Sequence, residues 1–178
     1  KNKVKVVLSG EGADEFLGGY DIFREVKIRS YLKKHPDSEI GKLLLRQVNQ
    51  FSDSGLASAP YGGLSYFYTH GASGGIFDSH ITRWRQFGFF SLFFSDDVRA
   101  NLKNTEYGGY NETLRLDCME DMCDWTEIQR SQYLEIKTFL SQYLLSSQGD
   151  RVSMANSVEV RFPFLDENLN RYCLSLND

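Results

Sequence analysis

The chain has 178 residues, of which 41% are hydrophobic, and this length suits a single domain with one core. Its formal net charge is −4 and its basic residues form no cluster, which argues against nucleic acid and against an anionic membrane as a partner. No apolar run approaches the roughly 20 residues of a membrane span. The three cysteines lack metal-ligand spacing, so we expect free thiols in a reducing compartment, with the cytoplasm as the default.

A short, mostly β-branched run near the start predicts a strand. Residues 4–8 (V-K-V-V-L) favour a strand buried on both faces of a parallel sheet. The glycine-containing turn 9–12 (S-G-E-G) follows at once, and residues 13–20 have the pattern of a helix that begins there. The glycines allow a tight turn and the close approach of a ligand. Because open α/β sheets bind ligands beyond the carboxyl ends of their strands, we expect a site at this turn.

Three carboxylates crowd the same turn. Asp14 and Glu15 fall in the first helical turn, where the helix dipole favours acids, so they could be capping charges. Glu11 precedes the helix, and capping explains it less well. The glycine spacing fits neither a dinucleotide fingerprint nor a P-loop. An acidic turn would repel a bare phosphate, but it suits a phosphate carried with Mg²⁺, which takes one or two carboxylates plus phosphate oxygens.

Two stretches of the chain resemble signatures of the glutamine-hydrolysing asparagine synthetase family. The first is S-G-E-G-A-D-E-F-L-G-G-Y at 9–20, and the second is Y-L-L-S-S-Q-G-D-R-V-S-M-A-N-S-V-E-V-R-F-P-F-L-D at 143–166. They occur in the family's order and at about its separation. The resemblance implies an α/β fold, a partial synthetase domain of the adenine-nucleotide α-hydrolase-like type with a Rossmann-like α/β/α parallel sheet. The chain itself is predicted to be mostly helical, with one evident strand.

The domain organisation follows from that single strand. A parallel strand needs neighbours in its sheet, so we expect residues 1–178 to be the C-terminal portion of a synthetase domain. The resemblance places a glutaminase domain and a pyrophosphate loop of S-G-G-x-D-S type upstream. We expect the fragment alone to be inactive, and its uncovered apolar surface to favour self-association into a homo-oligomer or a need for the upstream half.

The resemblance also implies a reaction. ATP would adenylate the side-chain carboxylate of aspartate, and ammonia from glutamine would attack the β-aspartyl-AMP. Ser9 and Gly10 would contact the nucleotide, Asp14 would hold Mg²⁺, and Glu11 would act at the amidation step. The chemistry agrees, because a metal bridging phosphates neutralises their charge, and ammonia attacking an acyl adenylate must give up a proton to a base such as a carboxylate.

An apolar face over 125–145 predicts a helix, and the second stretch begins as that helix ends, with a polar loop at 146–149 and with 150–151 opening the next element. Ser153, Asn156 and Ser157 are small polar residues that let a helix pass close to a substrate. Four charged residues either bind substrate or form a buried ion-pair network, since buried charges must be paired; they are Asp150, Arg151, Glu159 and Arg161.

Alternatives stay open for the substrate. The resemblance leads us to expect a basic residue beside Gln148 in the loop 146–149, and none is there. A related adenylating amide ligase of the β-lactam synthetase or peptide-tailoring type would share the chemistry with another acid or amine, although Glu11 favours ammonia. A helical interaction module without a reaction is a reading of another class, and the presence of Glu11 and Asp14 counts against it.

Overall fold

The computed structural model describes residues 4–41, 43–44, 75–80, 83–84, 93–104 and 121–176. The chain divides into two compact units, one made of Lys1–Lys27 with Thr126–Asp178 and the other of Ile28–Trp125. In these described ranges, no helix combines the length and the apolar character needed to cross a membrane.

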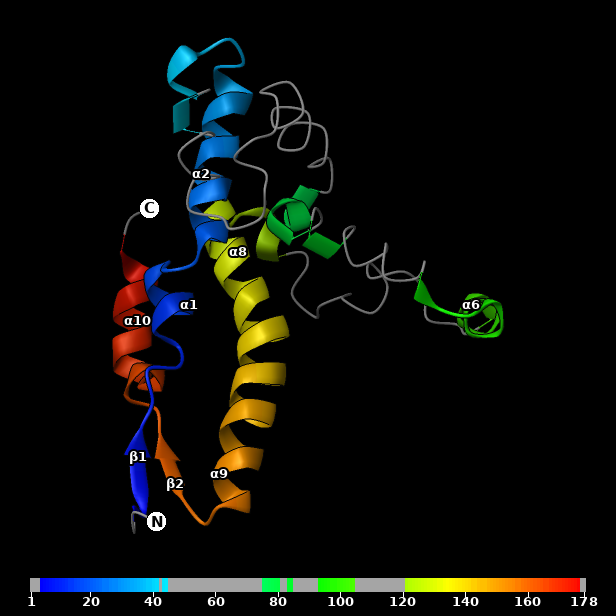
Figure 1. Cartoon of the computed structure of the whole chain (residues 1–178). Coiled ribbons are helices and arrows are strands. Elements are labelled where there is room, and N and C mark those ends of the chain that lie inside the picture. Colours follow the sequence, from blue (N-terminus) through cyan, green and yellow to red (C-terminus); the bar gives the residue numbers. More distant parts are fainter. Residues whose placement is uncertain are drawn as a thin grey trace. The chain divides into compact units, whose positions relative to one another are not determined.

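The first unit contains a small parallel sheet of two strands. Strand β1 (Val6–Leu8) pairs with strand β2 (Glu159–Arg161), with Val7 opposite Val160 (Figure 1). The sequence predicted one evident strand, and β2 is a second strand that was not predicted. The predicted burial was also wrong, since β1 is exposed along its length and Leu8 is 73% exposed. The reason is that β2 is the one strand paired with β1 among the described residues.

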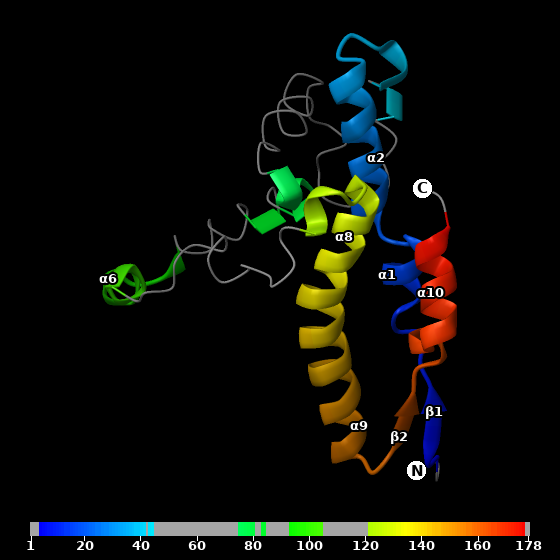
Figure 2. The ribbon, with the colours of Figure 1, turned by 180° about the vertical axis from the view of Figure 1, so that it is seen from behind.

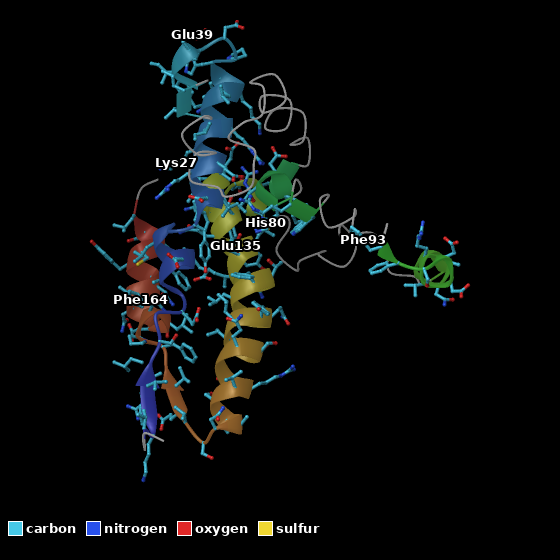
Figure 3. The ribbon with its side chains drawn as sticks, viewed as in Figure 1. Lys27, Glu39, His80, Phe93, Glu135 and Phe164 are labelled. Carbon is cyan, nitrogen blue, oxygen red and sulfur yellow. The ribbon has the colours of Figure 1, made fainter. Side chains whose placement is uncertain are left out.

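Two short helices follow the two strands. Helix α1 (Ala13–Leu17) ends at Gly18, which has a left-handed φ of 70°. Helix α10 (Glu167–Ser175) follows the 3₁₀ turn η6 (Pro163–Leu165), and the side chain of Asp166 caps it by accepting hydrogen bonds from two backbone N–H groups. Figures 1 and 2 show α1 and α10 side by side beyond the ends of the strands.

A long helical segment runs past the sheet and the short helices (Figure 2). It comprises α8 (Glu127–Glu135), the wider π-helical η5 (Ile136–Asp150) and α9 (Arg151–Ala155). Its start is fixed by a capping box between Thr126 and Gln129. The predicted loop at 146–149 is therefore wrong, because these residues are helical. Their polar groups fit inside a helix since the hydroxyl of Ser146 donates to the carbonyl of Gln142, one turn back.

The core of the first unit lies between the long helix, α1 and the first half of α2 (Asp21–Lys34). Gln132 of α8 donates a 3.0 Å hydrogen bond to the carbonyl of Phe16, which ties α8 to α1. The buried apolar side chains of this unit are each less than a tenth exposed: Ile22, Phe23, Val26, Leu134, Leu140, Leu144 and Cys173. Packing of this kind fixes the acidic turn on a rigid support.

The second unit begins within α2. Arg29 donates a 2.6 Å hydrogen bond to the carbonyl of Asp78, and Lys33 pairs with the carboxylate of the same residue at 2.7 Å. Asp78 follows the 3₁₀ turn η2 (Gly75–Phe77). Helix α6 (Asp96–Asn104) and the 3₁₀ turn η4 (Asp121–Cys123) complete its described elements. The predicted site residues all belong to the first unit.

Candidate functional site

The acidic turn is held by the sheet and by a glycine. The N–H of Ser9 donates a 2.9 Å hydrogen bond to the carbonyl of Arg161, which extends the pairing of β1 with β2. The N–H of Glu11 then donates to the hydroxyl oxygen of Ser9 at 3.3 Å. Gly12 adopts a φ of 94°, and a Cβ there would stand 2.5 Å from the side chain of Leu165. Glycine is required at this position both for the backbone conformation and for the close packing.

This turn opens onto a pocket of about 450 Å³ that combines the two signature stretches. Ser9 and Glu11 line it from the first stretch. The long helix lines it from the second, through side chains and a glycine spaced for one helix face: Gln148, Gly149, Val152, Ser153 and Asn156. Apolar groups complete the lining, from Val7, Leu8, Val158, Val160 and Phe162. The pocket is therefore mostly apolar, with a few polar groups, as ligand sites commonly are.

Among the described residues that line this pocket, Glu11 has the one ionisable side chain. It is partly buried, and its backbone is fixed by the bond to Ser9. A carboxylate held in this way at a pocket wall can accept a proton from a bound group. The structure therefore places the Glu11 carboxylate at the wall of this pocket.

Gly10 leaves an approach to the backbone open. A Cβ at Gly10 would meet no other atom within 4 Å, so packing within the described structure does not require a glycine there. The open space allows a ligand to reach the backbone of the turn, beside the hydroxyl of Ser9. The turn therefore offers a hydroxyl group and an unobstructed main chain to a ligand.

Asp14 lies outside the pocket lining, exposed on α1. Its carboxylate folds over Gly19, where an added Cβ would collide with it. No group of three potential metal-ligating side chains occurs among the residues that the structure describes. A Mg²⁺ ion on Asp14 would therefore take most of its ligands from phosphate oxygens and water, which is the usual habit of this ion.

Glu15 has a structural environment that the sequence analysis did not foresee. It is 1% exposed, and the hydroxyl of Tyr20 donates a 2.9 Å hydrogen bond to it. Burial raises the pKa of Glu15 above its ordinary value, although its hydrogen bonds act in the opposite direction. Burial and the bond to Glu15 also raise the pKa of Tyr20, so the phenol stays protonated and remains the donor. The three acids of the turn thus lie in three different environments.

The four charged residues of the second stretch do not line the pocket. Asp150 and Arg151 are exposed on the long helix. Glu159 and Arg161 form an ion pair of 2.7 Å, which agrees with the predicted pairing, but their side chains are 56% and 64% exposed, so the predicted burial is wrong. They stand two residues apart on β2 and share one face, whereas Val160 between them lines the pocket.

Three polar side chains of the pocket were not among the predicted site residues: Gln148, Ser153 and Asn156. The sequence pattern that could have identified them is their spacing along one helix face, which begins at Gln148. Ser153 and Asn156 were expected only as small polar residues near a substrate. The loop predicted at 146–149 interrupted the helix, so the face that they share with Gln148 was not recognised.

Comparison with known proteins places these stretches in context. A family model described as asparagine synthase matches residues 1–178. The chain is 30% identical over 179 residues to a Gibberella zeae protein named amidase chry2, which covers 95% of this chain and 25% of that protein. It shows the same values against amidase chyE of Penicillium rubens. It is 29% identical over 172 residues to the glutamine-hydrolyzing asparagine synthetase 1 of Bacillus subtilis, with 94% and 24% covered.

The chain spans about a quarter of the length of these relatives. No solved structure matches it. The family match covers both signature stretches and the turn that carries the pocket.

Proposed function

The chain belongs to the asparagine synthase family, and we propose from this premise that its pocket serves ATP-dependent amide formation through an acyl adenylate. The observation that carries the proposal is the pocket itself, where Ser9 and Glu11 of one signature meet Gln148 and Asn156 of the other. Stretches far apart in the sequence thus supply one cavity. The adenine-nucleotide α-hydrolase-like fold is part of the same proposal.

The reaction has two steps. In the first, a carboxylate oxygen of aspartate attacks the α-phosphorus of ATP, and pyrophosphate leaves. Ser9 contributes its hydroxyl and Gly10 its open backbone to hold the nucleotide. Mg²⁺, held by Asp14 together with phosphate oxygens, would supply charge neutralisation at this step.

In the second step, ammonia from glutamine attacks the carbonyl carbon of β-aspartyl-AMP. A carbon–nitrogen bond forms, the carbon–oxygen bond to AMP breaks, and the nitrogen must lose a proton. Glu11 accepts this proton, since it is the ionisable group of the pocket lining and its backbone is fixed. An N-terminal glutaminase domain of the same protein would supply the ammonia, and we expect a cytoplasmic enzyme that can form homo-oligomers.

A second candidate keeps the adenylate and changes the acid or the amine. Two relatives named amidases match 95% of the chain at 30% identity. The described lining of the pocket also includes no cationic side chain that would pair with a second substrate carboxylate. This candidate is a related adenylating amide ligase of the β-lactam synthetase or peptide-tailoring type.

One experiment tests the shared chemistry and separates the candidates. The protein at its natural length is incubated with ATP, Mg²⁺ and a panel of carboxylic acids, and acid-dependent pyrophosphate release is measured. Release with aspartate and conversion to asparagine on adding ammonia support the first candidate. Release with another acid alone supports the second. No acid-dependent release with any member of the panel, from a folded protein, overturns the adenylate proposal.

A further inference from the structure

Gln148 is held in the pocket wall by a neighbour on its own helix. Its Nε2 donates a 2.6 Å hydrogen bond to the hydroxyl oxygen of Tyr143. The two residues are five apart in η5, where backbone bonds run from i to i+5, so their side chains stand on one face. Gln148 is exposed, and it lines the same pocket as Glu11 of the acidic turn, so the bond to Tyr143 restrains an amide at the edge of that pocket.

Tyr143 is in turn supported by a row of rings that leads back to α1. The rings of Tyr143 and Phe139 have centroids 5.6 Å apart. The ring of Phe139 meets that of Tyr20 nearly edge to face, at 6.2 Å and 77°. Tyr20 ends the row by donating its hydroxyl to the buried Glu15. We call Tyr20, Phe139 and Tyr143 the aromatic row.

The row is not explained by core packing alone. Phe139 is 37% exposed and Tyr143 is 45% exposed, so both keep much of their surface in water. Their burial contributes less stability than that of a core aromatic. Their contacts nonetheless run without a gap from the buried acid of α1 to the side-chain amide of Gln148, a residue that lines the pocket. A role in orientation accounts for this arrangement better than a role in stability.

We propose that the aromatic row positions the pocket, by holding the Gln148 amide at a fixed place relative to Glu11. Tyr20 and Tyr143 act as positioning residues, because they reach the pocket only through Gln148. The inference rests on the proposed function and deepens it, since the amide fixed in this way binds the acid that is adenylated. Loss of either hydroxyl therefore loosens substrate binding and leaves the bond-making groups in place.

The first test needs no catalysis. The side-chain amide resonances of Gln148 are followed by ¹⁵N NMR in the protein at its natural length, selectively labelled at glutamine and assigned with Gln148→Asn. Tyr143→Phe moves the resonance towards that of a solvated amide, because the acceptor oxygen is gone. Tyr20→Phe moves it in the same direction by less, although Tyr20 does not touch Gln148. Tyr172→Phe, an exposed tyrosine on α10 outside the row, leaves it unchanged.

The second test uses kinetics of acid-dependent pyrophosphate release. Tyr143→Phe raises KM for the acid about 3- to 10-fold, the range that one hydrogen bond commonly contributes, and leaves kcat within about twofold. Tyr20→Phe has a smaller effect of the same kind. The double variant falls short of the product of the two single effects, since both act through one amide.

Phe139 provides a control that does not depend on either hydroxyl. Phe139→Tyr keeps the ring, so it retains the wild-type KM and the wild-type Gln148 resonance. Phe139→Leu removes the ring, so it raises KM and shifts the Gln148 resonance as Tyr20→Phe does. If the row had a purely structural role, its variants would lower kcat and stability together, and the conservative Phe139→Tyr would not keep the wild-type values of either. Wild-type resonances of Gln148 in Tyr20→Phe and Phe139→Leu would overturn the inference. Absence of pyrophosphate release in the wild type would overturn the proposed function, and the NMR result would still decide this inference.

Discussion

The hydroxyl of Tyr20 donates a 2.9 Å hydrogen bond to Oε1 of Glu15, an acid that is 1% exposed. The two residues belong to the same short signature, and the bond fastens the end of that signature to its middle. Burial raises the pKa of Glu15. A carboxyl group of this kind takes part in folding in a way that depends on pH.

The pH dependence of stability has a definite sign. An acid whose pKa is raised by folding binds more protons in the folded than in the unfolded state at pH values above its ordinary pKa of 4.5. The free energy of unfolding therefore falls as pH rises from 4.5 through the folded-state pKa. Glu15→Gln removes this titration but keeps an oxygen that accepts from Tyr20. We expect urea denaturation from pH 4 upwards to show a flatter profile for this variant.

Glu167→Gln provides the control for that profile. Glu167 is an exposed acid in the first turn of α10, paired with Arg171. Its removal leaves the fall in stability above pH 4.5 in place. A Glu15→Gln profile parallel to that of the wild type would show that Glu15 does not titrate differently in the folded state.

Glu11→Gln separates the two proposed steps. The amide cannot accept a proton from the attacking nitrogen, so amide formation falls by about 100-fold or more. Acid-dependent pyrophosphate release persists near the wild-type rate, since adenylation does not use this base. Glu159→Gln, whose side chain lies on the face of β2 away from Val160, changes neither step. Equal loss of both steps in Glu11→Gln would assign Glu11 to the nucleotide or to the fold.

Asp14→Asn tests the metal assignment. The variant loses a charged oxygen ligand, so its ATP turnover needs a higher Mg²⁺ concentration and partly recovers when Mg²⁺ is added. The measurement is pyrophosphate release across a Mg²⁺ titration. Asp97→Asn, an exposed acid in the first turn of α6, controls for helix-dipole effects. An unchanged Mg²⁺ midpoint in Asp14→Asn would leave Asp14 as a capping charge.

Two glycines of the same turn predict opposite phenotypes. Gly12→Ala forces a side chain into a left-handed conformation, which costs about 1–2 kcal/mol, and drives its Cβ against Leu165. It lowers the melting temperature. Gly10→Ala meets no atom within 4 Å, so it preserves stability, but its methyl group stands in the space proposed for the nucleotide and raises KM for ATP. Equal melting temperatures for the two variants would contradict the assignment of Gly12.

The first signature could be predicted from the sequence because its information is local. A β-branched run, a glycine turn and a helix start lie within 20 residues, and the structure contains β1, the turn and α1 in that order. The burial of Glu15 could not be predicted in this way. An acid in a first helical turn has the pattern of a capping charge. Its partner Tyr20 comes within hydrogen-bond distance because the chain turns at Gly18, where α1 ends.

The loop predicted in the second signature was wrong for a different physical reason. Residues 146–149 are polar and include a glycine, which is the composition of a loop. In the structure the hydroxyl of Ser146 bonds within the helix, and Gly149 is packed against Phe162, where a Cβ would stand 3.4 Å from the ring. Strand β2 was missed because it is three residues long and two of them are charged. Its strand character comes from pairing with β1.

The pairing of β1 with β2 also constrains how the pocket forms in time. The two strands are about 150 residues apart in the sequence, so a growing or truncated polypeptide without Glu159–Arg161 lacks the strand that pairs with β1 among the described residues, and it lacks the pocket wall at Val160. Contacts of such long sequence separation form slowly. Yet each doubling of the intervening loop costs only about 0.6 kcal/mol in closure entropy. The stretch between the two signatures can therefore change length in evolution at little thermodynamic cost, while the few backbone bonds that join Lys5 and Ser9 to β2 must stay.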